Sequence, residues 1–172
     1  GRTAVIQEKL RELGITDEIE IVDPHHFPKL ETYTQAYYEL RQRKGITLNV
    51  AQKLIADPHV LGPMMVKMGE ADAFLSGLTH SYPEVIRPAL QIHHTAAAQT
   101  IAAGIYMLIV ENKTYIFTDA TVNIDPTAEQ LSEIACLAAN FAKKLELNPR
   151  VAFLSFSNFG SAPHPLSNKV RK

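Results

Sequence analysis

The stretch AFLSGLTH, residues 73–80, is the part of this 172-residue chain that best indicates its fold. Ala73–Ser76 is short, apolar and followed by Gly77, a pattern typical of a buried parallel strand that ends in a loop. Helices are predicted on both sides of it, over residues 58–68 and 82–95. A strand between two helices predicts an α/β fold with a largely parallel sheet.

The same alternation of helices and strands continues outward from this stretch. Further helices are predicted over residues 3–13, 29–43, 47–55 and 127–145, strands over 18–23 and 151–156, and a hairpin over 103–110 and 114–119. Thr127 and Gln130 form a capping box at the start of the last of these helices. Near an alanine-rich stretch, residues 96–103, the pattern changes to the β-rich apolar runs of the predicted hairpin. We therefore expect a first α/β lobe over residues 1–96 and the start of a second lobe over 97–172. Both ends fall at the edge of predicted helices, which leads us to expect further sequence on either side.

Composition excludes several classes of protein. Hydrophobic residues make up 46% and charged residues 20%, as in an ordinary soluble domain. A formal net charge of -1 gives no overall field that favours nucleic acid or an anionic membrane. The longest apolar stretch, near residues 104–110, is too short to span a bilayer. The single cysteine, Cys136, builds no disulfide framework, so we expect a cytoplasmic protein without membrane or nucleic-acid partners.

Three polar loops follow predicted strands, at residues 76–80, 119–123 and 155–161. Open parallel sheets bind ligands at the carboxyl ends of their strands, and loops of this kind present backbone N–H groups to phosphates or carboxylates. The alternative is that they are ordinary connections, since polar loops follow most strands. The candidate ligand contacts in these loops are Ser76, Thr79, Asn123, Ser157, Gly160 and Ser161.

Two arginines are the strongest single candidates for binding an anionic group, because guanidinium binds phosphate bidentately. Arg87 lies between apolar neighbours, where an unpaired charge is costly. Arg41 lies in a cationic cluster with Arg43 and Lys44, and by itself this cluster favours a solvated helix C-terminus. For Arg87, the residues alone do not decide between an anion-binding side chain and an ordinary solvated charge.

Motifs for metal binding or catalysis are missing from the sequence. The histidine pairs at 25–26 and 93–94 are adjacent in sequence, so their side chains point apart, and no H-x-x-x-H partner accompanies them. No G-x-S-x-G elbow surrounds a serine and no G-x-G-x-x-G is present. We therefore expect no metal site, no dinucleotide site and no catalytic residue within this chain.

Three segments together resemble one family. Residues 73–77 followed by 86–92 are similar to an SG…RPALQI motif, residues 119–131 to D-x-x-V-N-x-x-P-T-A-E-x-L, and residues 152–161 to LSFSTKGSA. The chain thus resembles the phosphate acetyl/butyryl transferase family over nearly its whole length. The resemblance implies a two-lobed, parallel-sheet fold like that of isocitrate and isopropylmalate dehydrogenases, incomplete here, and family arginines at Arg41 and Arg87. The family's LSRG motif is missing, and Phe159 replaces a lysine.

Details of residues 77–84 and 158–161 resemble the C-terminal domain of bacterial NADP-dependent malic enzymes most closely. This implies a regulatory and oligomerisation domain that binds acetyl-CoA or a related acyl-CoA through Arg41, Arg87 and the three loops. The parent enzyme would convert malate to pyruvate with NADP and Mg or Mn, none of them held by this chain, and would form a homo-oligomer. Two alternatives stay open: a phosphate acetyl- or butyryltransferase, and a structural dimerisation module.

Overall fold

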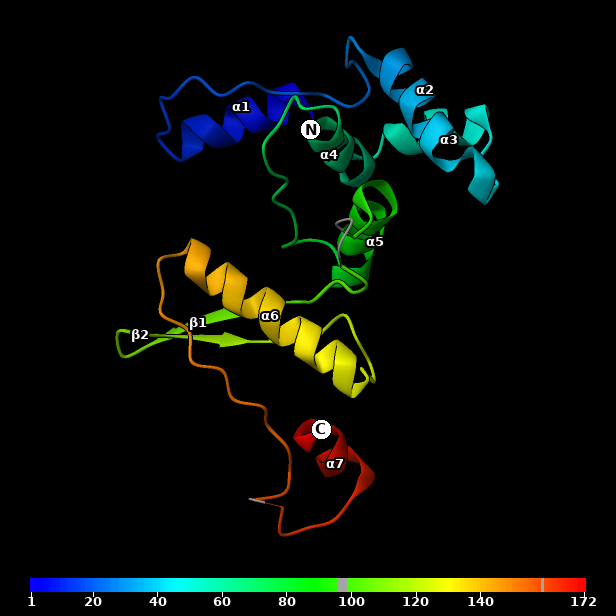
Figure 1. Ribbon diagram of the computed structural model, residues 1–172. Coiled ribbons are helices and arrows are strands. Elements are labelled where there is room, and N and C mark those ends of the chain that lie inside the picture. The colour runs from blue at the N-terminus through cyan, green and yellow to red at the C-terminus, as the bar shows by residue number, and fades with distance from the viewer. Residues whose placement is uncertain (96–98, 159) are drawn as a thin grey trace. The chain divides into compact units, whose positions relative to one another are not determined.

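The computed structural model of the chain describes residues 1–95, 99–158 and 160–172. The chain divides into two compact units, Gly1–His94 and Thr95–Lys172, which Figure 1 shows with their helices and strands labelled. Each unit is considered by itself below. The predicted lobe boundary, between residues 96 and 97, lies outside the described residues.

The first unit is helical throughout its regular structure. Its core is formed by Tyr33, Tyr37, Ala51, Ile55, Val60, Leu61, Met64 and Ile92. Around this core α2 (Leu30–Arg41) packs on α3 (Leu48–Ile55), and α4 (Pro58–Lys67) packs on α5 (Tyr82–His93). The elements are α1 (Thr3–Glu12), α2 (Leu30–Arg41), η1 (Gln42–Lys44), α3 (Leu48–Ile55), α4 (Pro58–Lys67) and α5 (Tyr82–His93). All five predicted helices of this region are confirmed, with ends that shift by a few residues.

Polar side chains at the helix starts explain where these helices begin. The Thr47 hydroxyl accepts the N–H of Val50 at the start of α3, and the Asp57 carboxylate accepts the N–H of His59 at 2.8 Å at the start of α4. At the start of α5 the backbone N–H of Ser81 donates to the Glu84 carboxylate, also at 2.8 Å. Each cap satisfies a backbone donor that the first helical turn leaves free.

In its described residues, the second unit combines a hairpin with two helices: β1 (Tyr106–Val110), β2 (Lys113–Phe117), α6 (Ala128–Lys144) and α7 (Pro165–Arg171). The two strands pair antiparallel through a two-residue turn at Glu111 and Asn112, with φ of +49° and +64°. Positive φ at both turn positions is the geometry that matches the twist of a tight hairpin. The predicted hairpin and the capping box of Thr127 with Gln130 are both confirmed.

The predicted largely parallel sheet is wrong for the described residues. The segments 18–23, 73–76 and 151–156 run there as irregular chain, and the sheet described consists of β1 and β2 alone. An apolar run indicates that side chains favour burial, but a strand also needs a neighbour that pairs with its N–H and C=O groups. Without such a neighbour Leu75 is 97% exposed and Leu154 is 76% exposed.

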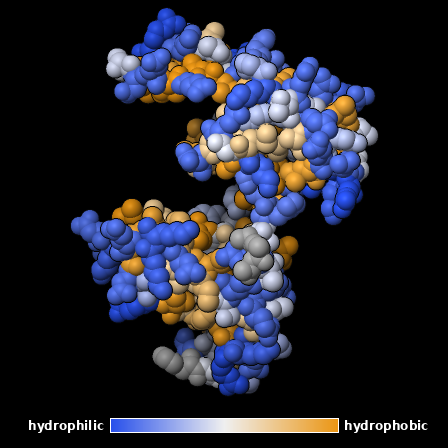
Figure 2. Space-filling view, turned by 45° about the horizontal axis from the view of Figure 1, so that its top comes forward, coloured by the Kyte–Doolittle hydropathy of each residue, from blue (hydrophilic) through white to orange (hydrophobic). Residues whose placement is uncertain are grey.

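Apolar residues also remain on the surface elsewhere. Figure 2 shows apolar patches between hydrophilic side chains, and every residue of β1 is exposed. Over residues 1–95, 99–158 and 160–172, the helices are too short or too polar to cross a bilayer.

Candidate functional site

The eight predicted ligand contacts fall into two groups of four. Arg41, Ser76, Thr79 and Arg87 belong to the first unit, and Asn123, Ser157, Gly160 and Ser161 belong to the second. The exposure and the hydrogen bonds of each side chain determine whether it is available to contact a ligand.

The loop before α5 carries Ser76 and Thr79, both exposed. The Thr79 N–H donates to the Gly77 carbonyl at 2.6 Å, so the chain turns tightly here. Gly77 has φ of +142° and Leu78 has φ of +50°, in the region that favours glycine. The turn leaves both residues on the surface.

Arg87 lies on the outer face of α5. Ile86 and Pro88 are half-buried, whereas Arg87 itself is exposed. Consecutive helical residues point in different directions, so apolar neighbours in sequence do not make an apolar surrounding. The expectation that Arg87 sits in an apolar setting is therefore wrong, because its side chain is exposed to solvent.

Arg41 is the last residue of α2 and is half-buried. Its Nε is buried and has no hydrogen-bond partner among the described residues. Burial raises the pKa of Tyr37, and the positive charge of Arg41 offsets part of that rise. A buried guanidinium donor without an acceptor is costly, so Arg41 is suited to binding an anion. The solvated helix end favoured by its cationic neighbours does not describe this side chain.

Asn123 belongs to a loop organised around Asp119. The carboxylate of Asp119 accepts the backbone N–H groups of Gly104, Thr121, Val122 and Asn123, at 2.8 to 3.2 Å. Burial alone would raise the pKa of Asp119, but these hydrogen bonds outweigh it and leave that pKa below its ordinary value. The Asn123 side-chain amide donates to the Ala102 carbonyl at 2.8 Å and also to Asp119. In this conformation the Asn123 amide therefore stabilises the loop through these two hydrogen bonds.

In the loop at residues 155–162, a serine hydroxyl also forms a hydrogen bond within the loop. The Ser157 hydroxyl accepts the N–H of Ala162 at 3.0 Å, which folds the loop back on itself. Gly160 has φ of +77°, which only glycine adopts readily. Ser161 is exposed, and its N–H donates to the Asn158 carbonyl. Of the three predicted contacts in this loop, Ser161 has the most accessible side chain, while Phe159 lies outside the described residues.

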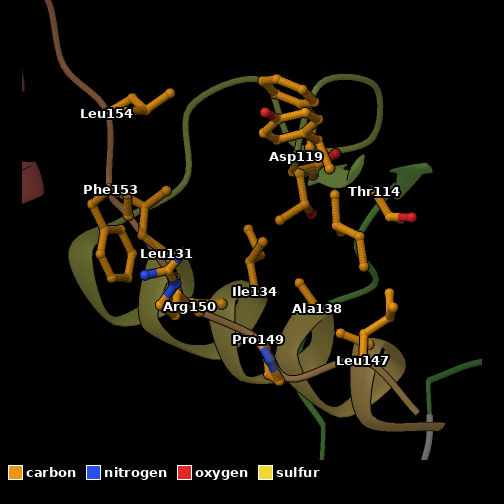
Figure 3. Close-up of a pocket in the computed structure, with 18 of the residues that line it drawn as sticks. Thr114, Asp119, Leu131, Ile134, Ala138, Leu147, Pro149, Arg150, Phe153 and Leu154 are labelled. Carbon is orange, nitrogen blue, oxygen red and sulfur yellow. The ribbon is translucent and has the colours of Figure 1, made fainter. Parts of the chain in front are cut away.

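A pocket that the motifs did not predict lies within the second unit. Figure 3 shows it between β2, α6 and the segment 147–154, with Asp119 at one end and Arg150 near Phe153. Its volume is about 800 Å³. Ile134, Ala138 and Leu147 give it an apolar lining, and none of the eight predicted contacts belongs to that lining. The apolar spacing along α6 is the sequence signal that indicates this face, but it does not distinguish a pocket from packed core.

Metal binding was also considered for the described residues. Over residues 1–95, 99–158 and 160–172, the histidine, cysteine, aspartate and glutamate side chains form no group of three with the geometry to hold a metal ion.

Comparison with known proteins gives a consistent result. The family model described as phosphate acetyl/butaryl transferase matches residues 1–172. The phosphate acetyltransferase of Thermoanaerobacterium thermosaccharolyticum is 45% identical over 159 residues, covering 88% of this chain and 48% of the relative. That of Bacillus subtilis is 39% identical, covering 99% of this chain and 53% of the relative.

Solved structures agree. A phosphotransacetylase from Streptococcus pyogenes matches with a TM-score of 0.87 and 37% identity, over 98% of this chain and 52% of that one. The EutD phosphotransacetylase from Staphylococcus aureus matches with a TM-score of 0.84 and 33% identity, over 99% and 52%. The chain has a phosphotransacetylase-like fold of helices and sheet, and it spans about half the length of these relatives.

These findings contradict the expectation of a malic-enzyme regulatory domain. Relatives and a solved structure that are 37% to 45% identical over most of the chain are phosphate acetyltransferases. The details at residues 77–84 and 158–161 that favoured the malic-enzyme branch are short loops, and loops vary most among relatives. An oxidoreductase assignment and a role for NADP have no support.

Proposed function

The chain belongs to the phosphate acetyl/butaryl transferase family, and on this premise we propose that the protein moves an acetyl or related short acyl group between an acyl phosphate and coenzyme A. The observation that carries the proposal is that sequence similarity to phosphate acetyltransferases extends over nearly the whole chain. This was the alternative to the regulatory domain in the interpretation of the sequence.

The reaction requires a place for a developing phosphate. The coenzyme A thiolate attacks the acyl carbon, a C–S bond forms, and the C–O bond to the phosphate breaks. Inorganic phosphate leaves with the electron pair of that bond, and the thiol proton goes to a base. Positive groups aimed at the phosphate oxygens stabilise this charge.

Arg41 and Arg87 are the groups of this chain that we assign to that task. The buried Nε of Arg41 is without an acceptor among the described residues, and Arg87 is exposed on α5. The Ser76 and Thr79 hydroxyls lie on the loop before the same helix. We assign these two hydroxyls to contacts with the acyl phosphate or the phosphates of coenzyme A.

Further features complete the proposal. An acyl-CoA is the partner, the protein works in the cytoplasm, and the two units correspond to lobes like those of isocitrate and isopropylmalate dehydrogenases. The apolar strand β1, whose residues are 41% to 70% exposed, supports a homo-oligomer, because large apolar patches mark association surfaces. The same strand also fits the second candidate function, a structural dimerisation module without a ligand.

A direct transfer assay distinguishes these functions. Thioester formation from acetyl phosphate and coenzyme A is followed in the protein with Arg41→Ala or Arg87→Ala. Loss of a group that stabilises transition-state charge lowers kcat/KM by about 100-fold or more. Arg43→Ala is the matched control, since Arg43 is an exposed cation close to Arg41 in sequence, and it stays within about twofold. A protein that dimerises but neither transfers acyl groups nor binds coenzyme A would support the structural module instead.

A further inference from the structure

Two histidine rings meet where the loop before α5 reaches the start of α4. The ring centroids of His59 and His80 lie 4.2 Å apart, and their planes are tilted by 54°. The His59 side chain is only 11% exposed, whereas His80 is an exposed residue of the loop. The pair therefore connects a surface loop to a packed helix within the first unit.

His59 is held on its helix from two sides. Its ring Nδ1 lies 3.1 Å from the Asp57 carboxylate, which also caps α4. The Phe74 ring lies against it edge to face, with centroids 6.4 Å apart. Because both its position and its orientation are set by these neighbours, His59 offers a defined surface to a ring on the loop.

The His80 ring also contacts Thr79, one of the predicted ligand contacts in this loop. The Thr79 hydroxyl lies 3.0 Å from His80 Nδ1, and the Thr79 N–H closes the tight turn on Gly77. A displacement of the His80 ring away from His59 therefore moves Thr79. Leu78, at the tip of the turn, is fully exposed and adds no packing that would oppose such a movement.

We infer that His59 is a positioning residue for the loop Gly77–His80, and that the two rings hold this loop in place only while they carry at most one positive charge between them. The inference rests on the proposed function, because Ser76 and Thr79 are the contacts that the loop supplies. Like charges in contact repel, so a second proton on the pair separates the rings and releases the loop.

Two carboxylates face the pair. Asp57 contacts the His59 ring from the start of α4. Hydrogen bonds from Ser81 lower the pKa of Glu84, in the first turn of α5, and the charges of His80 and His59 lower it further. Imidazole side chains in general change charge between about pH 5 and pH 8, and this range sets the two pH values of the test.

The test measures binding of coenzyme A and of acetyl phosphate to the full protein at about pH 7.5 and about pH 5.5. His59→Phe keeps a flat ring against His80 and Phe74 but takes no charge, while His59→Ala removes the ring. His25→Ala is the control, because His25 is an exposed histidine of the same unit. The ligands titrate equally in every variant, so each variant is compared with the unchanged protein at the same pH.

The unchanged protein and His25→Ala bind about three- to tenfold more weakly at the lower pH than His59→Phe, the scale of one aromatic contact. His59→Ala binds more weakly at both pH values. Equal behaviour of His59→Phe and the unchanged protein at both pH values would overturn the inference.

A measurement without ligand separates this inference from the proposed function. The amide NMR signals of Gly77 and Thr79 shift further with acid in the unchanged protein than in His59→Phe, where His80 is the one ring of the pair that can still take a charge. If neither ligand binds but this difference appears, the proposed function fails and the histidine device stands. If ligands bind and the signals of both proteins move alike, the device fails alone.

Discussion

The backbone N–H of Asn123 donates to the carboxylate of Asp119 at 2.8 Å, and the Asn123 side-chain amide bonds to the same carboxylate. This relationship makes Asp119 the centre of its loop. The N–H of Gly104 also reaches it, and a Cβ at Gly104 would overlap the Thr121 hydroxyl, so any larger residue there would force that hydroxyl to move. Asn123 thus contributes to any ligand site chiefly by keeping this loop in shape.

Replacing the carboxylate tests this role. Asp119→Asn exchanges a charged acceptor of several N–H groups for an amide whose nitrogen would face a donor. We expect a loss of about 1–3 kcal/mol in the free energy of unfolding, measured with urea, as is typical when charge-assisted hydrogen bonds are broken. Asp125→Asn is the control, because its side chain is 78% exposed and forms a surface ion pair with Lys169, and it changes the free energy of unfolding by less than about 1 kcal/mol. Equal effects of the two substitutions would contradict the assigned role.

The same carboxylate predicts an acid dependence of stability. Because the folded protein holds the pKa of Asp119 below its ordinary value of 3.8, the ionised form favours the folded state. Its contribution is complete above that ordinary pKa and is lost as pH falls through the folded pKa. The free energy of unfolding should therefore fall less steeply below about pH 4 in Asp119→Asn than in the unchanged protein. Parallel curves for the two proteins would exclude this contribution.

We predict that Gly62 is needed because the Phe74 ring leaves no room for a side chain, and not because of its backbone conformation. A Cβ on this residue of α4 would overlap the ring of Phe74. Alanine is favoured over glycine within a helix by about 1 kcal/mol, but overpacking costs about 1–3 kcal/mol, so Gly62→Ala should destabilise the fold overall. In a Phe74→Ala background the overlap is gone, and Gly62→Ala should become stabilising. A double-mutant cycle measured by urea unfolding checks this, and the same effect in both backgrounds would refute it.

Helices were the part of the fold that the sequence predicted best. Spacing of apolar residues located them, and local side-chain chemistry located their starts, as with Thr127 and Gln130 for α6. These signals lie within a few residues of one another and need no distant partner. The hairpin was predictable for the same reason, since two strands joined by a tight turn supply each other's pairing.

Sheet pairing and side-chain environment were not predictable in this way. Ala73–Ser76 has the composition of a buried strand, yet pairing depends on segments that the local pattern does not reveal. The exposure of Arg87 and the burial of Arg41 were also not predictable from their neighbours in sequence. Arg87 turned out to be exposed, while Arg41 has a buried donor without an acceptor among the described residues. Neighbours in sequence do not determine which way a helical side chain faces.

Equilibrium binding of coenzyme A to the full protein tests the central claim, that Arg41 and Arg87 hold an anionic group of the substrate. Calorimetry is performed on the unchanged protein and on Arg41→Ala, Arg87→Ala and the control Arg43→Ala. Each loss of a charge-assisted hydrogen bond is worth about 1.5–3 kcal/mol, so the first two variants should bind about tenfold to 100-fold more weakly, with the control unchanged. Coenzyme A binding of equal strength in all four proteins would contradict the account.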